Sequence, residues 1–133
     1  MSDPSANIVA GDAFRSEFAA RDGVQSTASG LLYQVITEGH GPKPGPTDRV
    51  EVHYHGTLTD GTVFDSSRES GETIVFGLNQ VIPGWTEALQ LMSVGSSYRI
   101  VLAPELAYGE MGAPPVIGPN ATLVFDVDLI ALP

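Results

Sequence analysis

The sequence predicts an α+β domain, an antiparallel sheet of about five strands with one short helix across it. Three observations support this prediction. Apolar and polar residues alternate in several short stretches between residues 31 and 132, which is the pattern of half-buried strands. One stretch around Trp85 has helical spacing instead. Clusters of glycine and proline separate these stretches from one another.

Length and charge limit what the domain can do. Its 133 residues suffice for one domain with a modest core. The net charge of −10 argues against a nucleic-acid or anionic-membrane partner, because such surfaces need clustered lysine and arginine. There is no cysteine, no apolar run as long as a membrane span and no visible signal peptide. We therefore expect a cytoplasmic protein, or a periplasmic or exported one whose signal segment was removed.

The N-terminal residues are predicted to form a segment of their own. After a disordered lead-in over residues 1–6, residues 7–21 favour an amphipathic helix that Gly11 weakens. Its apolar members are Ile8, Val9, Phe14 and Phe18. The helix either packs loosely on the domain or is the remnant of a longer arm or self-association element.

A polar linker over residues 24–30 is predicted to follow this helix. We therefore divide the chain into an N-terminal helical segment with its linker, residues 1–28, and a domain over residues 29–133. The domain contains every stretch that alternates like a strand.

Six stretches of the domain are predicted to be strands. They cover residues 31–38, 49–57, 63–65, 74–76, 97–103 and 122–132. The clearest is 49–57, in which Val50, Val52 and Tyr54 share one face and polar residues the other. One face of this strand is therefore buried and the other solvated. The segments predicted to be loops or turns are residues 39–48, 59–62 and 66–71.

The helical stretch lies between the fourth and fifth of these strands. The residues at helical spacing are Trp85, Ala88, Leu89 and Met92. Pro83 marks the start of the helix and Gly95 its end. Trp85, the only tryptophan, therefore lies in the first turn, where it either fills the core or forms the floor of a pocket.

Few residues offer covalent or metal chemistry. The absence of cysteine and of a Gly-x-Ser-x-Gly elbow argues against nucleophilic catalysis. Glu51, His53 and His55 share one strand face and could chelate a divalent ion, although a solvated polar face is the commoner meaning of such a pattern. Asp126 and Asp128 lie on the exposed face of the last strand, where we expect solvation. With no glycine-rich phosphate loop either, we expect no metal and no cofactor.

Apolar and aromatic residues at the ends of predicted elements remain as candidates for a binding site. They are Tyr54, Phe64, Val81, Ile82, Trp85, Tyr108, Val116, Ile117 and Phe125, with Asp65 beside Phe64. Residues 106–120, which contribute several of them, form a loop too apolar for simple disorder. Each residue alone would indicate core. Together they have the character of a small-ligand site, with mostly apolar walls and a few polar tips.

Five motifs then give the sequence a family resemblance. They are Tyr54-His55-Gly56, Asp60 to Ser67, Val81 to Trp85, Pro104 to Gly109, and Leu123 to Leu129. In this order and spacing they resemble the FK506-binding-protein (FKBP) family of peptidyl-prolyl isomerases, over residues 29–133. The lead-in from Gly11 to Leu31 resembles the bacterial macrophage-infectivity-potentiator branch, whose members carry a longer N-terminal helical arm that dimerises them.

The resemblance implies a sheet of five to six antiparallel strands wrapped around one short helix, and catalysis of rotation about X-Pro bonds. The catalytic positions that it implies are Phe64, Asp65, Trp85 and Tyr108. The substrate-binding positions are Tyr54, Phe64, Asp65, Ile74, Val81, Ile82, Trp85, Tyr108, Ile117 and Phe125. By this resemblance Trp85 lies under the proline ring, while the Tyr108 hydroxyl and the Ile82 amide donate hydrogen bonds to ligand carbonyls.

The same resemblance implies partners. Proline-containing polypeptides are the expected substrates, and the macrolides FK506 and rapamycin the expected inhibitors. We expect a monomer, with a dimer possible through the N-terminal segment, which should be dispensable for catalysis on short peptides. The alternative function is a proline-peptide binding module or chaperone that uses the pocket with little turnover.

The sequence departs from the family pattern at two places. Ile74 stands where many members have an aromatic wall, which predicts a smaller or more open pocket on that side. Residues 113–115, Ala-Pro-Pro, replace a more polar, His-containing loop. The second departure bears on the preference for the residue before proline.

Overall fold

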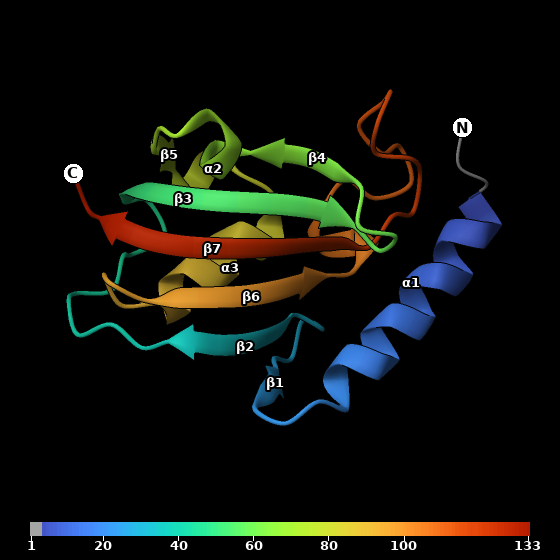
Figure 1. Ribbon diagram of the computed structural model, residues 1–133, viewed down its shortest axis with the longest axis horizontal. Coiled ribbons are helices and arrows are strands. Elements are labelled where there is room, and N and C mark those ends of the chain that lie inside the picture. The colour runs from blue at the N-terminus through green and yellow to red at the C-terminus, as the bar shows by residue number, and fades with distance from the viewer. Residues whose placement is uncertain (1–3) are drawn as a thin grey trace.

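The structure is a computed structural model that describes residues 4–133 (Figure 1). Its elements are α1 (Pro4–Ala19), β1 (Val24–Ser26), β2 (Leu32–Thr37), β3 (Arg49–Leu58), β4 (Val63–Ser66), α2 (Ser67–Ser70), β5 (Ile74–Gly77), η1 (Leu78–Gln80), α3 (Pro83–Leu91), β6 (Ser97–Leu102), η2 (Pro104–Leu106) and β7 (Leu123–Ala131). The predicted class is confirmed: an antiparallel sheet with one helix, α3, packed across it.

Seven strands form one antiparallel sheet in the order β1-β2-β6-β7-β3-β4, with β5 also paired to β3. Strand β3 is the longest and has two partners on one edge. Its residues 49–52 pair with β5 and its residues 55–57 with β4, while β7 runs along its other edge. Strands β4 and β5 therefore lie one after the other along the same edge of β3.

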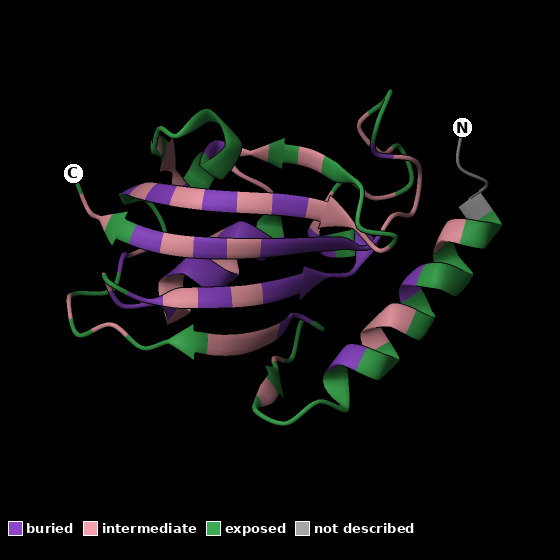
Figure 2. Ribbon diagram, viewed as in Figure 1, coloured by how far each residue is buried: buried purple, intermediate pink, exposed green. Residues whose placement is uncertain are grey.

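The core lies between α3 and the facing side of the sheet. Figure 2 shows the alternation that the sequence predicts, with buried residues recurring along β3, β6 and β7. Val50, Val52 and Tyr54 are all buried on the face predicted for them. Trp85 and Leu89 of α3 are buried against this face. The period of two in the strands and the helical spacing of α3 therefore specify the same core.

Two segments predicted to be loops are regular. Residues 24–26, within the predicted linker, form β1, which pairs with β2 through Val24 and Gln34. Residues 67–70, within a predicted polar loop, form the single turn α2. The Ser66 side chain caps this turn by accepting a hydrogen bond from the Glu69 N–H. Both elements are too short for periodicity to reveal them.

Helix α1 packs on the domain differently from the prediction. It begins at Pro4, so only residues 1–3 of the predicted lead-in lie outside the described residues. Ile8 and Val9, expected on its apolar face, are 45% and 69% exposed. Phe18 is 1% exposed and packs in a second cluster of buried residues, with Leu32, Val101 and Val124. The C-terminal half of α1 is therefore firmly attached to the sheet.

Candidate active site

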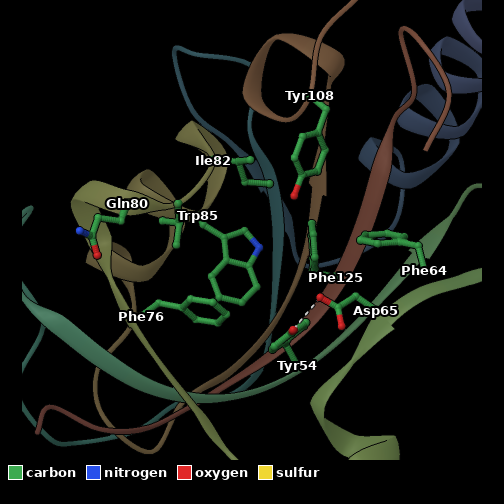
Figure 3. Close-up of a pocket in the computed structure, with 10 residues that line it drawn as sticks. Tyr54, Phe64, Asp65, Phe76, Gln80, Ile82, Trp85, Tyr108 and Phe125 are labelled. Atoms are coloured by element: carbon green, nitrogen blue, oxygen red, sulfur yellow. Dashed lines mark hydrogen bonds between the residues drawn. The ribbon is translucent and has the colours of Figure 1, made fainter. Parts of the chain in front are cut away.

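A cavity of about 370 Å³ opens between β3, β4, β5, α3 and the loop after η2. It is lined by Tyr54, Phe64, Asp65, Phe76, Gln80, Val81, Ile82, Trp85, Tyr108 and Phe125 (Figure 3). Its volume lies in the range of small-ligand sites, and most of its walls are aromatic or aliphatic. The residues come from strands, a helix terminus and a loop that the sheet brings together.

Trp85 forms the base of the cavity. Its ring centroid lies 5.3 Å from that of Tyr54, 5.5 Å from that of Phe76 and 5.4 Å from that of Phe125, each in an edge-to-face arrangement. Trp85 is 4% exposed, so these three rings fix its plane. Its buried Nε1 has no hydrogen-bond acceptor among the described residues and is turned toward Phe125 in Figure 3. The base of the cavity is therefore a closely packed aromatic ring.

Two glycines allow close packing around the cavity. A side chain at Gly84 would place its Cβ 2.5 Å from Leu102 Cδ2, so glycine lets the first turn of α3 lie against β6 with Leu102 in its present place. A Cβ at Gly56 would lie 2.7 Å from Phe64 Cζ and 2.9 Å from Phe125 Cε1. Phe64 and Phe125 instead cross edge to face, with centroids 5.4 Å apart. The glycine of the Tyr54-His55-Gly56 motif thus shapes one wall.

One hydrogen bond joins the polar groups in that wall. The Tyr54 hydroxyl donates to Asp65 Oδ2 at 2.7 Å. Burial, followed by this bond and the nearby Asp65 charge, raises the pKa of Tyr54 well above its usual value. The phenol therefore remains a neutral donor, and the Asp65 carboxylate is held at the rim, where it is solvent-exposed.

The mouth of the cavity has polar groups on two sides. Tyr108 follows η2 and is 41% exposed, and its hydroxyl points into the space between Ile82 and Phe125 (Figure 3). Ile82 precedes α3, and its carbonyl accepts hydrogen bonds from Trp85 N and Thr86 N. These bonds fix the peptide unit between Ile82 and Pro83 at the start of α3.

The structure brings together all the predicted substrate-binding residues except Ile74 and Ile117. Ile74 is on the same side of β5 as Phe76, but it is Phe76 that lines the cavity. Strand β5 thus supplies an aromatic wall through Phe76, and the smaller or more open pocket expected beside Ile74 stays a prediction. Ile117 is 5% exposed and packs in the main core, and its backbone pairs with Ala113 across the loop.

Phe76 and Gln80 line the cavity but were not among the residues predicted from the sequence. The alternation of β5 gave a signal for Phe76, since residues 74 and 76 share a strand face. No sequence signal singles out Gln80. In Figure 3 its amide is directed away from Trp85, so Gln80 contributes its stem to the wall.

The polar face of β3 is occupied by local contacts. His53 Nδ1 lies 3.0 Å from Ser67 Oγ, and His55 Nδ1 lies 2.9 Å from Ser66 Oγ. Glu51 accepts a hydrogen bond from the Thr73 hydroxyl. Residues 4–133 contain no group of three His, Asp or Glu side chains placed to hold a metal ion. In the same part of the chain, no helix is both long enough and apolar enough to span a membrane.

Comparison with known protein families gives two adjacent matches. Residues 41–130 match the family described as FKBP-type peptidyl-prolyl cis-trans isomerase. Residues 2–35 match the family described as the domain amino terminal to FKBP-type peptidyl-prolyl isomerase. The matched residues together cover nearly the whole chain.

Individual relatives agree with these matches. The probable FKBP-type peptidyl-prolyl cis-trans isomerase FkpA of Neisseria meningitidis is 52% identical over 98% of this chain and 48% of its own length. The outer membrane protein MIP of Legionella longbeachae is 48% identical over 95% of this chain and 54% of its own. The chain thus spans about half the length of these curated relatives. A crystal structure of a peptidyl-prolyl cis-trans isomerase from Pseudomonas syringae superposes with a TM-score of 0.91, at 41% identity over 99% of this chain and 97% of that one.

Proposed function

The chain belongs to the FKBP-type peptidyl-prolyl cis-trans isomerase family, as its motifs predicted, and we propose that its cavity catalyses rotation about X-Pro peptide bonds. The observation that supports this proposal most strongly is the base of the cavity. A buried indole at the base of the cavity is held edge to face by three other rings. We place the substrate proline on Trp85, with Tyr54, Phe64, Val81, Ile82 and Phe125 around it.

The proposed chemistry needs no nucleophile. Rotation about a peptide bond breaks amide resonance, with a barrier of about 18–20 kcal/mol. The twisted amide has less charge separation than the planar one, so it loses less on leaving water. A pocket with mostly apolar walls should therefore bind the twisted form more tightly, and this difference lowers the barrier. Each ~1.4 kcal/mol of the difference accelerates rotation about tenfold.

Hydrogen bonds at the mouth orient the substrate in this proposal. The Tyr108 hydroxyl and the Ile82 N–H each donate to a substrate carbonyl, on opposite sides of the proline. Asp65 faces the amide from the rim. Its bond from Tyr54 supports a structural tie, and its exposed position beside the cavity supports electrostatic stabilisation of the twisted amide. We propose Phe64, Asp65, Trp85 and Tyr108 as the catalytic group.

We also propose the partners of the site. Its substrates are proline-containing polypeptides, and FK506 and rapamycin compete with them for Trp85. We assign isomerisation to residues 29–133, since every lining residue falls between positions 54 and 125. Residues 1–28 form the N-terminal segment of a monomer that can dimerise through it. An extracytoplasmic location is supported by the name of the Legionella relative, an outer membrane protein.

A tetrapeptide isomerisation assay and a proline-limited refolding assay test the activity. We expect both rates to rise in proportion to protein concentration, to be suppressed by FK506 and to be insensitive to exhaustive chelation. FK506 binding without acceleration of either reaction would contradict the proposal and favour a binding module or chaperone. If activity were lost on chelation and restored by a divalent ion, the result would instead indicate a metal site at Glu51, His53 and His55.

A further inference from the structure

Helix α1 contacts the loop that carries Tyr108, far from the cavity itself. Asn7 Nδ2 donates a 2.8 Å hydrogen bond to the Pro119 carbonyl, across 112 positions of sequence. Figure 1 shows α1 running along the side of the molecule, from β1 to the loop that precedes β7. The N-terminal segment therefore touches the end of the long loop between η2 and β7.

A second contact lies one helical turn further along α1. A Cβ at Gly11 would fall 2.3 Å from Thr122 Oγ1 and 3.1 Å from Thr122 Cβ, so the helix backbone lies directly on this side chain. Thr122 is 3% exposed. Asn7 and Gly11 are four residues apart and share one helix face, which lies against the loop. The residue that weakens the helix in the sequence is the one that allows this close approach.

The end of the loop that α1 contacts is bonded to the backbone beside Tyr108. Asn120 N donates to the Gly109 carbonyl at 2.8 Å, and Gly109 N donates to the Pro104 carbonyl at 2.9 Å. Tyr108 is 41% exposed, so side-chain packing covers it only in part. The position of its hydroxyl therefore depends on the loop backbone, and that backbone is tied through Asn120 to the segment that contacts Asn7.

The other end of α1 is anchored independently. Phe18 is 1% exposed among Leu32, Val101 and Val124 on the sheet. Because Phe18 fixes the helix on the sheet, α1 does not move together with the loop. The hydrogen bond from Asn7 can therefore restrain the loop. Loss of the Asn7 bond should free the loop without releasing α1.

We propose that α1 holds the Tyr108 loop in its catalytic position and that Asn7 is a positioning residue for the Tyr108 hydroxyl. The proposal rests on the proposed isomerase function. It also replaces the expectation that the N-terminal segment is dispensable for catalysis.

The test compares Asn7→Asp with Val9→Asp. Asn7→Asp keeps the side-chain size, removes the N–H donor and adds a charge near the helix N-terminus, where acidic residues stabilise helices. Val9→Asp adds the same charge at a position that is 69% exposed. We expect Asn7→Asp to lower kcat/KM on a tetrapeptide about threefold to tenfold, the range for one lost hydrogen bond. Val9→Asp should retain the parent activity.

Two further measurements separate positioning from a general structural effect. In a Tyr108→Phe background, Asn7→Asp should cause no further loss, because the hydroxyl that it positions is gone. Hydrogen–deuterium exchange over residues 106–122 should increase in Asn7→Asp and not in Val9→Asp. Unchanged exchange, or an equal loss of activity in both backgrounds, would overturn the proposal. If the parent chain has no isomerase activity the proposed function fails, while exchange still decides whether α1 holds the loop.

Discussion

The Tyr54 hydroxyl donates a 2.7 Å hydrogen bond to Asp65 Oδ2, joining β3 to β4 across the wall of the cavity. The same Tyr54 ring lies edge to face with Trp85. One side chain thus links the apolar base of the site to the carboxylate at its rim. Changes at either end of this bond should separate the structural contribution of Asp65 from its catalytic one.

Asp65→Leu keeps approximate volume and removes the charge. We expect turnover on a tetrapeptide to fall more than affinity for a planar substrate, because the lost interaction is specific to the transition state. Tyr54→Phe is the matched control, since it removes the hydrogen bond and leaves the carboxylate in place. Rates are to be normalised to folded protein. Parental turnover per folded Asp65→Leu molecule would remove Asp65 from the mechanism and leave desolvation and shape as the explanation.

The ionisation of Tyr54 should be visible at alkaline pH. Its pKa is raised by burial and by Asp65, so the neutral phenol stabilises the fold fully below pH about 10, the pKa of a free tyrosine. That stability is lost as the pH rises above about 10 toward the folded-state pKa. Absorbance at 295 nm should show a late-titrating phenol that Tyr54→Phe abolishes. Burial also raises the pKa of Tyr98, so a second late phenol should remain in the variant.

Trp85 should report ligand binding directly, since it is the only tryptophan and forms the base of the cavity. We expect FK506 or rapamycin to change its fluorescence in a saturable manner, because the ligand ring would displace water from the indole face. Isothermal titration calorimetry supplies the independent measure of binding. Saturation by calorimetry with an unchanged emission spectrum would show that the macrolide binds elsewhere.

Much of the fold could be predicted because its elements are strongly periodic. The alternation of Val50, Val52 and Tyr54 identifies both the strand and its buried face, and Trp85 with Leu89 identifies the facing helix. Strand β1 was not predicted because Val24, Gln25 and Ser26 are too few to show a period, and they form a strand only by pairing with the edge of β2. Such pairing is a tertiary property that no local pattern encodes.

Some residues of the cavity also depend on tertiary structure that no local pattern encodes. Ile74 and Phe76 share a strand face, and sequence alone gives both an equal claim on the pocket. The register of β5 places Phe76 opposite Val50, and Ile74 opposite Val52. Phe76 reaches Trp85 from there, with ring centroids 5.5 Å apart. The choice between the two residues therefore depends on strand register and on the place of α3, which become known only with the fold.

Phe64 and Tyr108 should differ in what they contribute. Phe64 supplies apolar wall against Phe125, so Phe64→Ala should weaken macrolide binding and turnover together. Because Phe64 is only partly buried, its stability cost should lie below the ~3–5 kcal/mol of a fully buried ring. Tyr108→Phe removes one hydroxyl, worth about 0.5–1.5 kcal/mol, so affinity should fall about tenfold at most with little change in Tm. Equal Tm losses in the two variants would contradict this division.

Phe18 should be the residue through which the N-terminal segment stabilises the domain. It is 1% exposed against Leu32, Val101 and Val124, whereas its stacked neighbour Phe14 is only partly buried. Phe18→Ala should therefore lower the free energy of unfolding by about 3 kcal/mol or more, because it leaves a cavity beside the sheet. Phe14→Ala, the control on the same helix, should cost clearly less.

Urea unfolding followed by Trp85 emission measures both variants with one probe. Trp85 lies in the main core, on the other side of the sheet from Phe18, so its signal reports unfolding of the domain and not local loss of α1. A chain that starts at Thr27 should lose at least as much stability as Phe18→Ala, since it exposes the same three residues. If instead Phe18→Ala and the shortened chain both unfold at the parental urea concentration, the attachment of α1 to the sheet contributes nothing to folding. In that case α1 could not serve as the anchored arm that holds the Tyr108 loop.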